Sequence, residues 1–148
     1  MLSHLLVFLM VAAPVLGSYE CVHVSGTVAC KRDPEMVMRG RVKVDLWEYD
    51  ALWQRFGFNH DDYITTTKTK GNGHFTITGC AHDNDLLMMV DRPDPYIRIR
   101  HYCNENEEVM RIDLPQVFVP TKQEFRTPIY LDAGNYNNQW TIDKVEGK

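Results

Sequence analysis

Alternation of apolar and polar side chains with a period of two is the feature that most constrains this chain. It occurs in five short runs, each with one apolar face and one polar face. Such runs are typical of antiparallel strands that pack on one side and face water on the other. The apolar positions are Val22, Val24, Val28 and Cys30; Val42, Val44 and Leu46; Phe75 and Ile77; Ile97 and Ile99; and Met110, Ile112 and Leu114.

Two further segments favour strands. Residues 63–70 are rich in β-branched side chains and lead into a Gly71-Asn72-Gly73 turn. Residues 127–131 form the other, in which Pro128 indicates an edge strand or a late start. No amphipathic helix longer than two turns is expected, and residues 49–62 and 81–95 are expected to be irregular loops. The pattern predicts an all-β sandwich of about seven antiparallel strands.

The first 17 residues are predicted to be a secretory signal peptide. Residues 5–16 carry no charge, and twelve residues are too few to cross roughly 30 Å of bilayer hydrocarbon as a helix. Cleavage after Gly17 leaves residues 18–148 as one secreted domain without a transmembrane segment; a buried first strand or a retained anchor is the alternative. The four cysteines, Cys21, Cys30, Cys80 and Cys103, all lie in this domain. Their even number favours two disulfides over a metal site, and spacing alone leaves all three pairings open.

Composition limits the functions open to the chain. Its 148 residues carry a formal net charge of −4, which argues against a nucleic-acid binder that works through overall basicity. No GxSxG, HExxH or GxxxxGK[ST] motif is present, and no cofactor is implied. Ser25 and His23 share one strand face, where an exposed polar surface is preferred to a nucleophile and base.

Several motifs follow one another along residues 20–137. They are GTVAC at 26–30, VKVDLWEYD at 42–50, KT at 68–69 with GHFTITG at 73–79, DPYIRIRHYC at 94–103, LP at 114–115 with VFV at 117–119, and YLDAG at 130–134. This series resembles the nematode transthyretin-like family. The resemblance implies a prealbumin-like sandwich with Greek-key-like connections.

The resemblance also bears on the cysteines and on catalysis. Members often carry a cysteine where this chain has Met110, so Cys103 needs another partner. The transthyretin strand order implies the pairs Cys30–Cys80 and Cys21–Cys103. Related sandwiches include the 5-hydroxyisourate hydrolases, with HVLD, GRT and terminal YRGS motifs. This chain has GTVA at 26–29 and TKT at 67–69 at the first two places, and it ends in VEGK. We therefore expect no enzyme activity.

Acidic and histidine residues form two loop clusters, at residues 60–62 and 82–85. Their spacing does not match an EF-hand, so solvated turns are preferred to a cation site. Whether Asp83, Asn84 and Asp85 bind a cation stays open. His101 lies on the apolar side of its run, which predicts a hydrogen-bonded core histidine rather than a metal ligand.

A basic patch bordered by aromatic side chains is the candidate ligand site. Alternation places six side chains on outward faces: Arg41, Lys43, Trp47, Arg98, Arg100 and Tyr102. In a transthyretin-type sheet their two strands are expected to flank the strand that carries His74, Thr76 and Thr78. Such a patch suits phosphate or carboxylate groups. Ordinary solvation, with cross-strand pairing to Asp45 and Glu48, is the alternative.

These features together predict a secreted, non-enzymatic binding protein. Its expected partner is an extracellular protein, a glycan or an anionic lipid surface. A carrier of a small hydrophobic ligand is the second hypothesis, and a hydrolase is the third.

Overall fold

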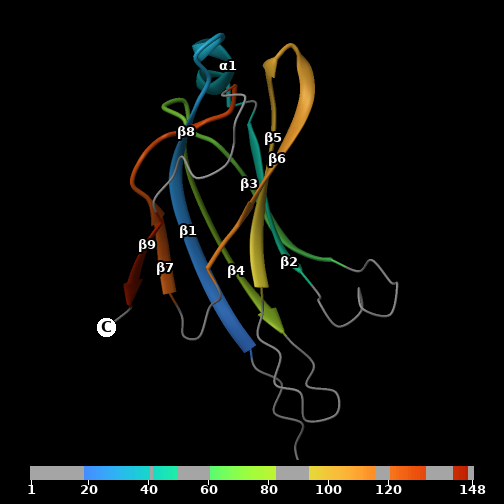
Figure 1. The fold of residues 1–148 in the computed structure, drawn as a ribbon, viewed down its shortest axis with the longest axis vertical. Helices are drawn as coiled ribbons and strands as arrows, with labels where there is room; N and C mark the ends of the chain where they lie inside the picture. The colour runs from blue at the N-terminus through green and yellow to red at the C-terminus, as the bar shows by residue number, and fades with distance from the viewer. Residues whose placement is uncertain are drawn as a thin grey trace, which may run out of the picture.

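The computed structural model describes residues 19–40, 42–49, 61–82, 94–115, 121–132 and 142–146. These residues form two β-sheets that pack face to face (Figure 1). The first sheet contains β1 (Tyr19–Ala29), β4 (His74–His82), β7 (Thr121–Phe125), β8 (Ile129–Tyr130) and β9 (Ile142–Glu146). The second contains β2 (Lys43–Tyr49), β3 (Asp62–Lys68), β5 (Asp94–Asn104) and β6 (Asn106–Asp113). The predicted all-β sandwich is confirmed.

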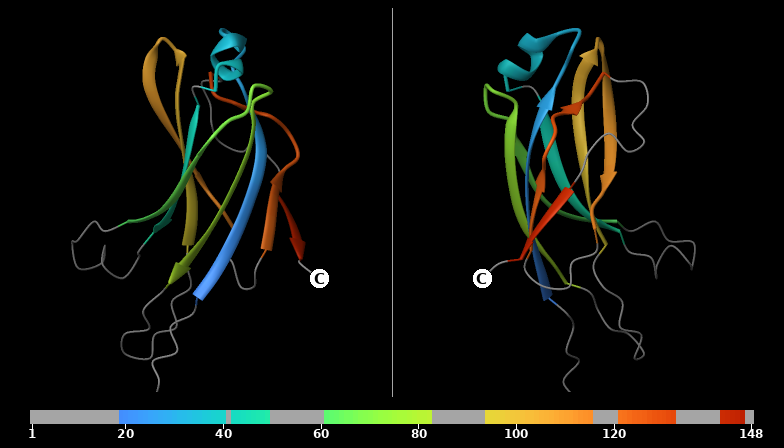
Figure 2. Two further views of the ribbon diagram at one scale, coloured as in Figure 1. Left: turned by 180° about the vertical axis from the view of Figure 1, so that it is seen from behind. Right: turned by 60° about the vertical axis from the view of Figure 1, so that its left-hand side comes forward.

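The strand order places sequence-distant segments side by side. The first sheet runs β4-β1-β7-β9, with β8 also beside β1, and the second runs β3-β2-β5-β6. Views from two further directions show the two layers (Figure 2). Pairs are antiparallel except that β7 and β8 lie parallel to β1. Strand β8 starts directly after Pro128, which is the late start that the sequence predicted, because proline has no N–H to donate to a neighbouring strand.

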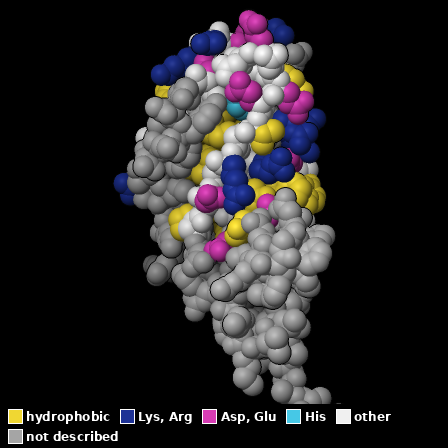
Figure 3. All heavy atoms as spheres, turned by 45° about the vertical axis from the view of Figure 1, so that its right-hand side comes forward, with side chains coloured by type: hydrophobic (Ala, Val, Ile, Leu, Met, Phe, Trp, Pro, Cys, Tyr) yellow, Lys and Arg dark blue, Asp and Glu magenta, His cyan; other side chains and the backbone are white. Residues whose placement is uncertain are grey.

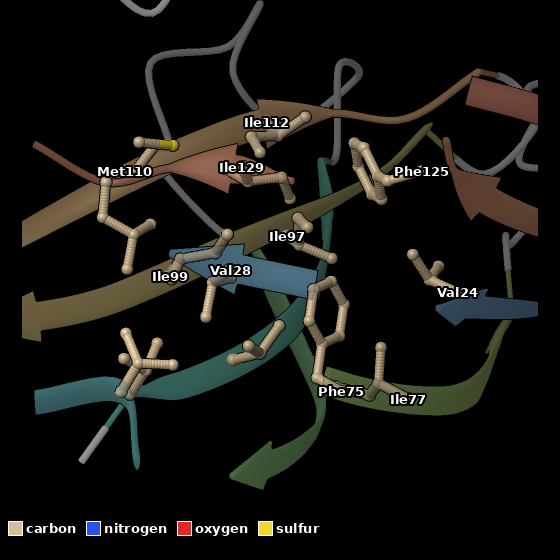
Figure 4. Packing of buried hydrophobic residues seen from close by; sticks show 14 of the residues in the cluster. Val24, Val28, Phe75, Ile77, Ile97, Ile99, Met110, Ile112, Phe125 and Ile129 are labelled. Atoms are coloured by element: carbon tan, nitrogen blue, oxygen red, sulfur yellow. The ribbon is translucent and has the colours of Figure 1, made fainter. Parts of the chain in front are cut away.

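The apolar faces predicted from alternation line the space between the sheets. Val24, Leu46 and Ile97 are fully buried, and Phe75 lies 6.4 Å from Phe125, measured between ring centroids. Side chains from both sheets meet in this layer (Figure 4). Burial of this apolar surface supplies the main favourable free energy of folding.

A five-residue helix, α1 (Pro34–Met38), lies between β1 and β2 in the chain. The Asp33 side chain accepts a hydrogen bond from the Met36 N–H at 3.2 Å, and Pro34 occupies the start of the helix, where its missing N–H costs nothing. Met36 and Val37 are buried. Among the described residues, none belongs to a helix with the length and apolar character needed to cross a membrane.

The predicted turn before β4 depends on Gly73. This residue has φ +78°, and its N–H donates to the Lys70 carbonyl at 2.8 Å. A Cβ atom there would collide with the Val28 carbonyl oxygen and approach Val37. Glycine is therefore required both by the backbone conformation and by the space available.

The predicted disulfide pairing, Cys30–Cys80 and Cys21–Cys103, is wrong. The structure pairs Cys21 with Cys80 and Cys30 with Cys103. The prediction assumed that the first strand and the Phe75 strand end at the same edge, but β1 and β4 are antiparallel. The start of β1 therefore meets the end of β4, and Cys21 lies directly opposite Cys80. Cys30, just after β1, then reaches Cys103 on β5 in the other sheet.

Candidate binding site on the outer face of one sheet

Five of the six predicted patch residues lie on two neighbouring strands of the second sheet. Lys43 and Trp47 belong to β2, and Arg98, Arg100 and Tyr102 belong to β5. These strands pair directly, with Lys43 opposite Arg100. Arg41 lies outside the described residues. The face of this sheet that points away from the core is called the outer face below.

One part of the predicted arrangement is wrong. We expected these two strands to flank the strand that carries His74, Thr76 and Thr78, but that strand, β4, pairs with β1 in the other sheet. The chain changes sheets between β3 and β4, so nothing separates β2 from β5. Because β2 and β5 pair directly, their basic side chains lie closer together than expected.

The first row of the outer face crosses three strands and holds three cations. Lys68 on β3 lies opposite Lys43 on β2, which lies opposite Arg100 on β5. Residues directly opposite in antiparallel strands have their side chains on the same face, and like charges in such pairs destabilise a sheet. The sequence pattern did not single out Lys68, because this residue ends a β-branched run that predicts a strand but not a binding site.

The second row lies two residues further along the strands. Asp45 on β2 is opposite Arg98 on β5, and Arg98 is opposite Arg111 on β6. Arg111 lies between the apolar positions Met110 and Ile112, so alternation gives it a polar face, and the tight turn that joins β5 to β6 brings it beside Arg98. Figure 3 shows Lys and Arg side chains gathered on this side of the molecule, with Asp and Glu side chains among them.

Ion pairs hold several of these cations in place. Lys43 Nζ lies 3.2 Å from the buried carboxylate of Asp45, and Arg100 Nε lies 3.3 Å from Glu107. Arg111 Nε lies 2.7 Å from Asp113. Asp45 does pair with a cation, but that cation is Lys43 on its own strand rather than one across the strands as the alternative expected.

Two cations of the outer face differ from the others. In the part of the chain that the structure describes, neither Lys68 nor Arg98 makes an ion pair. The Arg98 guanidinium instead lies over the Trp47 ring, 5.2 Å from its centroid. No carboxylate of the described residues therefore forms an ion pair with either of these two cations.

A third row of aromatic side chains lies next to the cations. Trp47 is half-buried and contacts Tyr63 edge-on at 5.3 Å between ring centroids. Arg111 stacks on Tyr96 at 3.8 Å, and the Tyr96 hydroxyl donates to Asp61 at 2.6 Å. Burial and this hydrogen bond to a carboxylate raise the pKa of Tyr96, so it stays neutral. Tyr102 is exposed at the rim and donates to Glu107 at 3.0 Å.

The histidines do not form a metal centre in the described residues. No group of three His, Cys, Asp or Glu side chains suited to a metal ion occurs there. His101 is fully buried, and its Nδ1 accepts the Cys103 N–H at 3.3 Å, which confirms the predicted core histidine. Burial lowers its pKa. His23 faces outward and contacts Thr78 at 2.6 Å. His60, Asp83, Asn84 and Asp85 lie outside the described residues.

Comparison with known proteins adds to this geometry. Residues 25–129 match the sequence model of the transthyretin-like family. The chain belongs to the transthyretin-like family. A transthyretin-like relative, Transthyretin-like protein 5 of Caenorhabditis elegans, is 28% identical over 124 residues, which cover 81% of this chain and 77% of the relative. The predicted nematode transthyretin-like resemblance is confirmed.

Proposed function

We propose that this transthyretin-like chain is a secreted, non-enzymatic binding protein whose outer face engages an anionic extracellular partner. Residues 1–17 act as the signal peptide in this proposal, and residues 18–148 form the mature domain. Two disulfides suit an oxidising extracellular environment.

The observation that carries the proposal is the set of like-charged pairs on the outer face. Lys68–Lys43, Lys43–Arg100 and Arg98–Arg111 are all directly opposite across neighbouring strands. Each such pair costs stability, whereas opposite charges at the same places would contribute it. An anionic ligand that bridges the pairs removes the repulsion and gains charge-assisted hydrogen bonds.

The non-enzymatic part rests on the residues at the positions where the hydrolases have their motifs. Gly26 and Val28 face the core on β1, and GTVA at 26–29 supplies no histidine there. Thr67, Lys68 and Thr69 replace the GRT turn. His23, the histidine nearest these positions on β1, pairs with a threonine hydroxyl instead of orienting toward an acid and a nucleophile.

The carrier hypothesis has one structural observation in its favour. A cavity of about 170 Å³ lies beside α1, lined by Val28, Ala29, Cys30, Pro34, Val37, Met38, Gly71 and Asn72. Pockets for drug-sized ligands are typically 300–1,000 Å³, so this one suits a single small apolar group. Light scattering separates the two ideas: a monomer favours surface binding, and a tetramer that co-purifies with a hydrophobic ligand favours the carrier.

A binding screen tests the proposal. The mature protein is presented with anionic vesicles, sulfated glycans and extracellular proteins, beside an Arg98→Glu/Arg100→Glu variant and a Lys122→Glu control. Lys122 is exposed on the other sheet, so the control reverses one positive charge, half the change made by the double variant, without touching the outer face. We expect binding that the double variant loses and the control keeps. Equal binding by the double variant, with its fold intact by circular dichroism, would remove the outer face from the proposal.

A further inference from the structure

The geometry points to a sulfated glycan chain, lying across the strands, as the anionic partner of the outer face. This inference rests on the proposed function and specifies its ligand. It is carried by the arrangement of cations and carboxylates on the outer face, by the side chains that cover its aromatic rings, and by its scarcity of exposed apolar groups.

The cations form lines rather than a cluster. Neighbouring strands lie about 4.8 Å apart, so Lys68, Lys43 and Arg100 span roughly 10 Å in a line perpendicular to the strands. Arg98 and Arg111 form a second, parallel line about 7 Å away, two residues along each strand. Lines of this kind match a ligand whose negative charges repeat along a chain.

The carboxylates argue against a flat anionic surface. Asp45, Asp61, Glu107 and Asp113 contact the same cations, so the outer face as a whole is close to neutral. A membrane would bring its headgroups against the carboxylates and the cations alike. A narrow chain can follow one line of cations and leave the carboxylates at its sides.

The apolar side chains of the outer face also argue against a membrane. Trp47 is half-buried with Arg98 over its ring, and Tyr96 is buried beneath Arg111. The exposed Tyr63 lies on β3 at one edge of the sheet, and the exposed Tyr102 and Val109 lie near each other on β5 and β6 toward the other edge. The Tyr102 hydroxyl donates to Glu107, so within the described residues this face offers few apolar side chains that could enter the lipid.

The same covering arginines disfavour single-stranded nucleic acid. Proteins that bind it use open aromatic faces on which bases stack. Here Arg98 and Arg111 occupy the positions over Trp47 and Tyr96. Sulfate groups need only N–H donors. Arg100 Nε lies 3.3 Å from Glu107 without a hydrogen bond, and among the described residues no hydrogen bond engages its two terminal nitrogens, which can therefore donate to a sulfate.

The test uses heparin as the sulfated probe. Full-length mature protein is titrated with heparin oligosaccharides of two lengths, with desulfated heparin, with anionic phospholipid vesicles and with oligo-dT. Lys68→Gln and Arg100→Gln change the two ends of the first line, and Lys122→Gln is the matched control on the other sheet. Lys43 is left unchanged because its loss would strand the buried Asp45 carboxylate.

We expect heparin to bind, the longer oligosaccharide to bind more tightly, and desulfated heparin to fail. Each end variant should weaken heparin binding about tenfold, and Lys122→Gln should leave it unchanged. Binding to vesicles or oligo-dT in preference to heparin, with the same sensitivity to the end variants, would overturn the glycan and leave the proposed function standing. Failure to bind any anionic probe would overturn both. Heparin binding that the end variants leave intact would overturn the assignment to this line.

Discussion

Arg98 of β5 and Arg111 of β6 lie directly opposite each other with their side chains on the same face of the sheet. Their surroundings differ. Arg98 lies over the Trp47 ring and forms no ion pair with the described residues, whereas Arg111 contacts the Tyr96 and Tyr49 rings and two carboxylates. The protein therefore anchors one arginine of the pair firmly and leaves the other available.

This asymmetry predicts different costs for the two substitutions. Arg98→Gln removes a like-charge repulsion along with its contact to Trp47, so the free energy of unfolding should change by less than about 0.5 kcal/mol. Arg111→Gln loses its stacking and its ion pairs and should cost about 1–2 kcal/mol. Urea unfolding measures both. Equal costs would contradict the assignment of Arg111 as the anchored member.

The glycine turn before β4 gives a second prediction with an internal control. Gly73→Ala should destabilise the fold by about 2 kcal/mol or more, because it adds a side chain at φ +78° and against the Val28 carbonyl. Gly71→Ala should cost much less, since the nearest atom to its added Cβ is the Met38 carbonyl oxygen at 3.5 Å. Chemical denaturation compares the two, and a similar loss in both variants would contradict this explanation.

The two disulfides should differ in accessibility. Cys21 and Cys80 are half-buried on the outer side of the first sheet, whereas Cys30 and Cys103 are 4% and 3% exposed. Mild reductant under native conditions should therefore release Cys21 and Cys80 first. Alkylation followed by peptide mapping identifies the released thiols and also the pairing itself. Early release of Cys30 and Cys103 would show that their burial does not protect them.

Acid should weaken the fold through His101. Its folded pKa is lowered below 6.5 by burial, and Glu108 and Asp132 only partly oppose this shift. The unfolded chain then binds more protons below pH 6.5, so the free energy of unfolding falls as the pH drops, until the pH passes below the folded pKa. The slope from this group is at most about 1.4 kcal/mol per pH unit.

A variant that cannot titrate isolates this effect. His101→Met places an apolar side chain in the core that cannot titrate. The variant should lack the part of the pH dependence that is due to His101, although the Cys103 N–H loses its acceptor. Urea unfolding at pH 7.5, 6.5 and 5.5 compares the variant with the unchanged protein. Parallel pH profiles would show that His101 is not the group responsible.

Local sequence patterns predicted most of the strands. They did not predict every strand, nor which strands are neighbours in a sheet. Alternation identified the inward faces of β1, β2 and β5 because each apolar residue there is buried. Strand β7 was missed because its central inward residue is Gln123, a buried amide that donates to the Pro115 carbonyl and interrupts the apolar pattern. Strand β9 was missed as well.

The candidate site was likewise predicted only in part. Alternation placed Lys43, Arg98 and Arg100 outward correctly, but it says nothing about which strands are neighbours. The adjacency of β2 to β5 is set by the packing of the whole sandwich, whereas β5 and β6 are neighbours because a tight turn at Glu105 joins them. Lys68 and Arg111 were recognised as part of the site only once these neighbours were known, and the antiparallel direction of β1 and β4 determined the disulfides.

The most direct test of the outer face as a binding surface is an NMR titration of the ¹⁵N-labelled mature protein with a heparin tetrasaccharide at low salt. We predict that the largest shifts occur at the backbone amides of Lys43, Lys68, Arg98 and Arg100 and at the arginine Nε–H groups, and that added salt reverses them. Shifts centred instead on His23, Thr76 and Thr78 of the other sheet, or no shifts at all, would contradict the proposal.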